Sequence, residues 1–533
     1  MPEYLSPGVY IQEVNTGPRP IEGVGTAMAA FVGFAPAGPA NTPTLITNWS
    51  QYVDTFGLAD EGGRRNPHMP GAYLSHAVYG FFLNGGGRCY VDRVVAAPNG
   101  DGRGKARGAV GAGAAVEAVA QLPSRSARGQ PSLSASRKSI QGGDILIEVA
   151  PPTQVGEEAP PEGTFTLKVR MGDKEETFDN VSLGRKGARS AVDTVNQASQ
   201  LIALLELQSP GSIAERTPTL GVYTLKAPEQ TAIVPEIKST DFVGDVAERS
   251  GLEGLEVAED VTMVCCPDLM SAYQAGAIDA EGVKAVQLAM IAHCERMGDR
   301  MAILDPLPDL TPQQAKRWRE KDTNYDSKYA AVYYPWLKVA GADGATLEVP
   351  PCGHMAGVWA RSDNERGVHK APANEVLRGA LGPAAQITKG EQDMLNPGGV
   401  NCIRSFTGRG VRVWGARTLS SDPAWRYVNV RRLFNYVEES IELGTQWVVF
   451  EPNDQELWAR VRRDVGAFLT GAWREGMLFG ATPAEAFFVK CDAENNPQDV
   501  RDRGQLIIDV GMAPVKPAEF VVFRFSQYAG GGQ

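Results

Sequence analysis

Short continuous apolar runs, separated by a segment with helical spacing, form the clearest pattern in the chain. Residues 261–266 and 300–304 are apolar runs, whereas 280–297 places its apolar residues at helical spacing. Strand, helix and strand in this order predict a right-handed βαβ crossover and a partly parallel sheet. Further strands are predicted at 26–34, 89–95, 330–334 and 357–361, and a capped helix is predicted to begin at 309–312.

The segment from residue 96 to residue 260 differs from the rest of the chain in composition. All nine tryptophans and all seven cysteines lie outside it, and 98–136 is rich in Gly, Ala, Arg and Ser with little periodicity. Strands are predicted at 144–149, 164–169 and 223–225, and a helix at 191–207. We interpret 96–260 as a small α+β domain, opened by a linker, that is inserted into a larger domain.

A second α+β unit follows from about residue 421. Its predicted helices lie at 428–443 and 454–475, and its predicted strands at 446–450, 485–490, 506–510 and 520–525. The predicted fold class is therefore a multidomain α/β and α+β chain. Its parts are an N-terminal arm at 1–20, a split α/β core at 21–95 and 261–420, the inserted α+β domain at 96–260 and a C-terminal α+β domain at 421–533.

Both ends of the chain have the pattern of β-strands without a partner nearby in sequence. Open strand edges risk aggregation unless another chain covers them, and strand addition between copies is the ordered solution. The pattern therefore favours a self-assembling structural protein over a catalyst. The residues predicted to form an intersubunit sheet are Val9, Tyr10, Ile11, Gln12, Glu13, Val14, Phe520, Val521, Val522, Phe523, Arg524 and Phe525.

The predicted helix at 454–475 has two different faces. Its apolar side carries Leu457, Val461, Val465, Phe468 and Ala472. Three arginines fall within about 60° of one another on the opposite side, with two small residues on or beside that stripe. Small residues let a partner approach closely, and arginines pair with carboxylates. Two interpretations remain open, a face exposed to solvent and a face that docks on a partner. They concern Arg460, Arg463, Ala467, Gly471 and Arg474.

Composition and charge narrow the class of protein. The chain has 533 residues, 43% of them hydrophobic, and a net charge of −11, which argues against general nucleic-acid binding. No apolar run reaches the eighteen or so residues of a membrane span, and the N-terminus does not resemble a secretory signal. Scattered cysteines without a C-x-x-C pair suit synthesis in a reducing cytoplasm.

Matches to the residue spacings of known catalytic and ligand-binding motifs are poor throughout the sequence. The glycine-rich stretch ending at Lys105 has one residue too few for a phosphate loop and lacks the following Ser or Thr. The five histidines show no metal-ligand spacing. His293 and Cys294 are neighbours on a predicted helix and point about 100° apart, so they cannot share a proton. We expect no catalytic residues, no cofactor and no metal.

Between residues 404 and 432 the sequence has seven arginines and a single acidic residue, Asp422. They form either a basic face paired with acids elsewhere or a surface for an acidic partner. Both alternatives stay open. The arginines are Arg404, Arg409, Arg412, Arg417, Arg426, Arg431 and Arg432.

Several phrases of the sequence, in order, resemble the sheath proteins of contractile phage tails and related contractile injection systems. They are Tyr4-Leu5-Ser6-Pro7-Gly8-Val9-Tyr10-Ile11-Gln12-Glu13-Val14, Asn396-Pro397-Gly398-Gly399-Val400-Asn401, Val413-Trp414-Gly415-Ala416-Arg417-Thr418-Leu419, Tyr427-Val428-Asn429-Val430-Arg431-Arg432, Phe450-Glu451-Pro452-Asn453 and Gly511-Met512-Ala513-Pro514. The resemblance covers roughly 1–95 and 261–528 and leaves out the insert. It implies a single-chain sheath subunit, since both ends are present.

The resemblance implies a structural role with defined partners. Hexameric rings would stack as a helical sheath around an inner tube and contract to drive that tube through a target envelope. The arm and the C-terminal strand would join neighbouring copies, the C-terminal domain would dock on the tube, and the insert would face outward. Baseplate and terminator or cap proteins are the other implied partners, without nucleic acid or direct membrane insertion. A baseplate component and an α/β enzyme with an unrecognised site are the alternatives.

Overall fold

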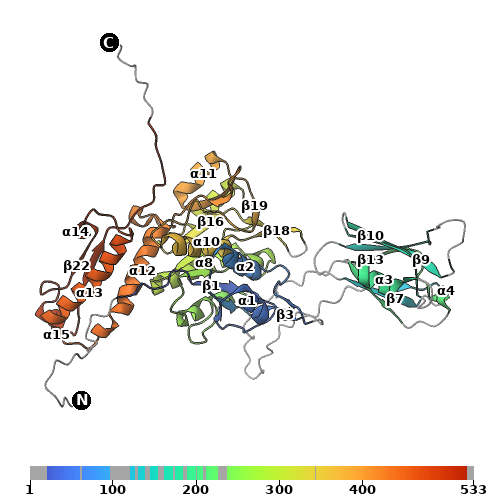
Figure 1. Cartoon of the computed structure of the whole chain (residues 1–533), viewed down its shortest axis with the longest axis horizontal. Helices are drawn as coiled ribbons and strands as arrows, with labels where there is room; N and C mark the ends of the chain where they lie inside the picture. Colours follow the sequence, from blue (N-terminus) through green and yellow to red (C-terminus); the bar gives the residue numbers. More distant parts are fainter. Residues whose placement is uncertain are drawn as a thin grey trace, which may run out of the picture.

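The computed structural model describes residues 21–524, except 60–62, 96–119, 127–129, 138–143, 154–160, 162, 172–173, 184–188, 200, 208–211, 226–236 and 342–343. The predicted arm at 1–20, including Val9 to Val14, lies outside the described residues, as does Phe525. Three separate hydrophobic clusters organise the rest of the chain into a core, an insert and a C-terminal domain (Figure 1).

An eight-stranded sheet forms the centre of the core, in the order β2-β5-β1-β14-β15-β16-β20-β21. Its six inner strands run parallel, and the two edge strands are antiparallel to their neighbours. The predicted βαβ crossover is confirmed, because α8 (Ala280–Met297) connects two parallel strands, β14 and β15. The strands are β1 (Ala29–Gly33), β2 (Thr44–Ile46), β5 (Cys89–Arg93), β14 (Met263–Cys265), β15 (Met301–Leu304), β16 (Ala330–Tyr334), β20 (Val400–Phe406) and β21 (Gly410–Val413).

Two helices pack closely against one another beside this sheet, α2 (Leu74–Asn84) and α10 (Cys352–Arg366). A Cβ added at Gly353 would lie 2.4 Å from the backbone of Ala77, so this approach requires glycine. The strand predicted at 357–361 is wrong, because these residues belong to α10. The first twelve residues of α10 are all buried, which leaves no polar face to reveal the helical period.

Shorter elements complete the core. Thr311 caps α9 as predicted, since its side chain and that of Gln314 form a capping box. A small three-stranded sheet has the order β18-β17-β19. These elements are α1 (Trp49–Phe56), α7 (Asp268–Gln274), α9 (Pro312–Arg317), α11 (Lys389–Leu395), β17 (Leu337–Ala340), β18 (Thr346–Val349) and β19 (Ala380–Pro383), with a π-helical turn η2 (Trp318–Thr323) after α9.

Residues 237–260 belong to the core rather than to the insert. Phe242, on α5 (Ser239–Val243), is buried in the core cluster, and its ring lies 5.4 Å from that of Phe34. Leu252, on α6 (Gly251–Gly254), is buried in the same cluster. The predicted boundary at residue 260 is therefore wrong, and the insert ends before Ile237.

The insert has its own sheets and its own cluster, and it lies apart at one end of the molecule (Figure 1). The helix predicted at 191–207 ends early, as α3 (Ala191–Ala198), because the side chain of Asn196 bonds the backbone of Leu204 on the returning strand. Five strands form one sheet and three form another: β8 (Ile145–Ala150), β9 (Thr164–Met171), β10 (Lys174–Ser182), β11 (Arg189–Ser190) and β13 (Gly221–Leu225), then β6 (Ala120–Pro123), β7 (Pro131–Arg137) and β12 (Ile202–Glu206).

The C-terminal domain packs two long helices and a two-stranded sheet, β22-β23, around the third cluster. The predicted helices are confirmed as α12 (Val428–Gly444) and α13 (Gln455–Arg474). The strand predicted at 446–450 is wrong, since a 3-10 turn, η5 (Gln446–Val448), stands there. The other predicted strands shift, to β22 (Phe487–Lys490) after α14 (Pro483–Ala486), and to β23 (Asp509–Met512). Among the described residues, no helix has the length and apolarity to cross a membrane.

Candidate assembly surfaces

The C-terminal tail is fastened to the body up to residue 519 and exposed after it. The segment that follows β23 in sequence pairs with residues 477–479, where the N–H of Phe479 donates to the carbonyl of Ala513 at 2.8 Å. Past Glu519, residues 520–524 belong to no strand in the single chain, and this part of the tail extends away from the body (Figure 1). Phe520 is 72% exposed and Val522 is 75% exposed. The described apolar residues of the segment predicted as a strand, 520–523, are thus exposed to solvent.

Glu519 holds the base of this tail. The Arg417 guanidinium donates from Nε at 2.8 Å and from Nη2 at 2.7 Å to its two carboxylate oxygens. Asn396 donates at 2.9 Å and the Tyr427 hydroxyl at 2.8 Å. Burial opposes ionisation, but these donors outweigh it and lower the pKa of Glu519. The tail therefore leaves the body at a fixed point.

The start of the described chain is fastened to the C-terminal domain rather than to the core alone. Ile21 is buried in the third cluster, beside Gly444 at the end of α12. The N–H of Val24 donates to the Ser440 hydroxyl at 3.1 Å. Residues 21–24 were predicted to belong to the core, and this packing corrects that assignment. Any arm before Ile21 therefore starts from the α12 surface.

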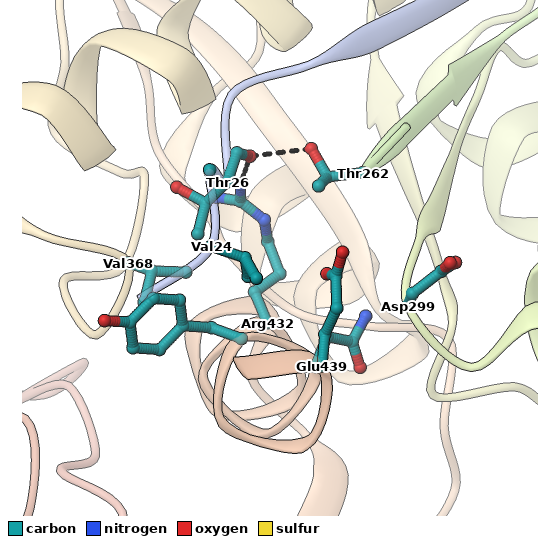
Figure 2. A pocket seen from close by; sticks show the side chains of 10 residues that line it. Val24, Thr26, Thr262, Asp299, Val368, Arg432 and Glu439 are labelled. Atoms are coloured by element: carbon teal, nitrogen blue, oxygen red, sulfur yellow. Dashed lines mark hydrogen bonds between the residues drawn. The ribbon is translucent and has the colours of Figure 1, made fainter. Parts of the chain in front are cut away.

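A buried ion pair joins the C-terminal domain to the core. Arg432 on α12 donates to both oxygens of Asp363 on α10, at 2.8 and 2.6 Å, and to the carbonyl of Thr26 at 2.8 Å. The hydroxyl of Thr262 donates to the same carbonyl at 2.7 Å (Figure 2). These contacts tie α12, the first described segment and the core sheet together at one place.

The small cavity at this joint contains a second acidic group, Glu439, which lies across from Asp299 (Figure 2). Burial raises the pKa of Glu439 to about 7, with a further contribution from Asp299. The cavity holds only about 10 Å³, room for one water at most, so it is no ligand site. It is a feature of the domain joint.

The face predicted for docking lies on α13. The helix begins at Asp454, whose side chain accepts from the Leu457 N–H at 2.9 Å. Arg463, Ala467 and Arg474 are exposed, as predicted for the polar side of this helix. Arg460 is partly buried because its guanidinium stacks on the Trp447 ring, 4.5 Å from its centroid. Gly471 is also partly buried.

Part of this face borders a groove that the sequence did not reveal. The groove has a volume of about 450 Å³. Its wall and floor come from three segments of the chain and are lined by Ile21, Gly23, Tyr436, Phe468 and Ala472, with Arg463, Asp464, Ala467, Gly471 and Glu475 around them. Arg460 and Arg474 do not line it. One wall comes from residues more than 400 positions before α13, so helical spacing within α13 could not indicate it.

The arginine run is not one surface. Arg417, Arg431 and Arg432 are buried and pair with Glu519, Glu438 and Asp363. Arg409 and Arg412 instead reach Asn374. Of the two alternatives, pairing with acids elsewhere holds for the three buried arginines. Arg417 and Arg432 connect segments that are distant in sequence, whereas Arg431 pairs within α12, and an exposed basic face does not form from the three.

Comparison with known proteins gives a consistent result. The family described as phage tail sheath protein central domain matches residues 250–419, and the phage tail sheath C-terminal domain matches 420–527. The tail sheath protein of Burkholderia phage BcepMu is 24% identical, over 97% of this chain and 95% of that protein. That of Vibrio phage KVP40 is 28% identical, but the match spans only 33% of this chain and 26% of that protein.

Solved structures agree along nearly the whole chain. The contracted helical sheath of the anti-feeding prophage is 25% identical with a TM-score of 0.56, covering 98% of this chain and 99% of that one. The anti-feeding prophage baseplate matches with a TM-score of 0.55 at 25% identity, over 98% and 99% of the two chains. The two matched families together span residues 250–527, more than half of the sequence. The chain therefore belongs to the contractile tail sheath family, whose members are structural proteins rather than enzymes.

Proposed function

We propose that this chain is a sheath subunit that polymerises as stacked hexameric rings around an inner tube. Contraction of this sheath drives the tube through a target envelope. The observation that carries the proposal is the apolar tail, anchored at Glu519 and then exposed at Phe520, Val521 and Val522. Exposed apolar residues on an extended segment are a liability unless another chain covers them.

The two-stranded sheet β22-β23 is a suitable acceptor for such a segment. Within the described residues each of its strands has one strand neighbour, so an edge of each is open to strand addition. An isolated two-stranded sheet is marginally stable and gains from further strands. The arm at Val9 to Val14 and the tail of neighbouring copies would supply them. About six ladder hydrogen bonds at a net ~1 kcal/mol each would hold one junction.

Weak docking on the tube suits the same scheme. Arg463 and Arg474 are exposed on α13, and exposed ion pairs contribute only ~0–1 kcal/mol each. Many such contacts set the register of the extended sheath, yet they release together. Contraction then needs no nucleotide, because copies slide into a better-packed state while the shared sheets stay intact. The insert decorates the outside, and baseplate and terminator or cap proteins bind the two ends of the sheath.

Deletion of residues 1–14 tests this proposal. The shortened chain should remain soluble and folded by circular dichroism but form no tubular assemblies in negative stain. A second variant keeps the length of the arm but replaces the residues from Val9 to Val14 by Gly and Ser. It should also form no tubular assemblies. Normal tubes from either variant would contradict the shared-sheet proposal. Long striated cylinders from the intact chain distinguish a sheath from a baseplate component, which forms none.

A further inference from the structure

Phe450 stands out among the described residues because its side chain is fully exposed and its backbone is strained. It lies between α12 and α13, with φ at +67°. Positive φ is a genuine outlier for a bulky residue and costs on the order of 1–3 kcal/mol. Val449 beside it is 65% exposed, and Leu443 at the end of α12 is 51% exposed. A large apolar group held in this way indicates a contact surface.

The loop that carries Phe450 is held by its own interactions. Asn453 accepts a hydrogen bond from the Trp458 indole at 2.8 Å and donates to the carbonyl of Gln505 at 2.8 Å. The N–H of Glu451 donates to the carbonyl of Val448 at 3.1 Å. Phe450 is therefore presented by a preorganised turn, which lowers the entropic cost of inserting it into a partner. Rigid, desolvated aromatic anchors are typical of binding hot spots.

The same domain offers a receptor for an aromatic side chain. The groove beside α13 holds about 450 Å³ and is lined by the aromatic rings of Tyr436 and Phe468 and by Ala472. Arg463 borders the groove but is already paired with Asp464 at 3.1 Å, and Glu475 also lines it. The groove therefore suits Phe450 through its aromatic lining and its volume rather than through charge.

Phe450 is fully exposed in its own chain, so it does not occupy the groove of the same copy. About nine residues of α13 separate Asp454 from Arg463, the first groove residue on this helix, which at 1.5 Å per residue is about 14 Å. Two complementary patches at different places on one molecule make a heterologous contact. Repetition of such a contact closes a ring or builds a helix. Members of this family are found in helical sheaths, as in that of the anti-feeding prophage, which makes a second copy the natural partner.

We propose that Phe450 of one copy inserts into the α13 groove of an adjacent copy. This inference rests on the proposed function, because Arg463, Ala467 and Gly471 belong both to the groove and to the proposed tube-docking face. One groove cannot hold a neighbour's phenyl ring and the tube at once. The contact therefore forms on copies that have left the tube, and it adds buried apolar area to the contracted state.

Disulfide trapping between two single variants tests the contact. All seven native cysteines are buried, so introduced thiols react selectively. Phe450→Cys and Ala467→Cys chains are mixed, polymerised without tube and oxidised. A 450–467 disulfide identified by mass spectrometry is the expected result, strongly reduced when polymers form on tube. Gly471→Cys is the second acceptor, since a Cβ there meets nothing within 4 Å. Polymers without either link overturn the inference.

A second measurement uses a truncation. Phe450→Ala should raise the critical concentration for tube-free polymerisation about tenfold or more, as expected for a hot spot. Leu381→Ala on β19 is the matched control, because Leu381 is 64% exposed on the core and outside the groove. An unchanged critical concentration for Phe450→Ala contradicts the inference. If the unsubstituted chain itself forms no polymers, the proposed function is refuted instead, so the two failures are distinguishable.

Discussion

Arg417 and Glu519 form a two-point ion pair that joins positions 102 residues apart, with distances of 2.8 and 2.7 Å. The arginine side chain is 11% exposed and the glutamate 19%, so water screens the pair only weakly. The pair fixes where the exposed apolar tail departs from the body. A tail that starts from a defined point can reach the same place on every neighbour, which a repeating assembly requires.

Loss of this anchor should disable assembly more than folding. Glu519→Gln keeps the shape of the side chain but removes its charge. The loss of charge weakens the hydrogen bonds that the side chain accepts, and a hydrogen bond to a charged group contributes about 1.5–3 kcal/mol. We expect a nearly unchanged urea midpoint and a several-fold lower yield of sedimentable polymer. Asp499→Asn is the control, since its ion pair with Arg503 is well exposed and contributes little. Equal polymer yields from both variants would refute the anchoring role.

Arg432 and Asp363 connect the two large domains through a buried pair, with side chains 4% and 3% exposed. Asp363→Asn leaves the arginine charge buried without a counter-ion, which costs about 3–5 kcal/mol. A lower urea midpoint for unfolding is the expected outcome. The double variant Asp363→Asn with Arg432→Met removes that charge and should recover part of the loss. If the double variant is no more stable than the single one, the isolated charge is not the cause.

A helix with a visible period and short apolar strands were predictable from the sequence, whereas a helix buried along its first three turns was not. The helix at Ala280–Met297 and the strand at Ala330–Tyr334 have the boundaries that their patterns predict. Helix α10 has no exposed face along its first three turns, so its apolar stretch at 357–361 has the pattern of a strand. Residues 446–450 also have a strand-like pattern, although the apolar Phe450 at their end is fully exposed.

The assembly surfaces were predictable only in part. The exposed side of α13 follows from helical spacing, because that information lies within one element. The anchor of Glu519 depends on Arg417, Asn396 and Tyr427, which only the folded core brings together. The groove likewise needs Ile21 beside α13. Contacts between distant segments carry no local periodicity, so a single sequence does not indicate them.

Charge reversal at two arginines of α13 should separate tube binding from polymerisation. Arg460 and Arg474 belong to the proposed docking stripe but lie outside the groove lining. Arg460→Glu with Arg474→Glu should weaken loading onto the tube, with a stronger effect at low salt, because screening already weakens the contacts at high salt. Co-sedimentation of sheath with tube measures the loading. Tube-free polymers should form normally, and unchanged tube loading would show that α13 does not face the tube.

Glu439 should make the domain joint sensitive to pH. The group is partly buried, which raises its pKa to about 7, and it is faced by Asp299, Asp260 and Arg300 of the core and by Glu442 of its own helix. Between the usual glutamate pKa near 4.5 and this value, the folded chain keeps a proton that the unfolded chain has lost. Stability contributed by this residue therefore falls as pH rises through that window and stays low above it.

The substitution Glu439→Gln isolates this effect, because glutamine resembles the protonated acid at every pH. The variant should match the native chain in urea midpoint near pH 4 and exceed it at pH 8. Asp268 and Asp305 also have pKa values raised to about 7 by burial, so both chains keep a downward slope and only their difference reports on Glu439. Glu365→Gln, exposed on α10, is the control and should track the native chain throughout. A constant difference between Glu439→Gln and the native chain across the range would show that the joint does not respond to the ionisation of Glu439.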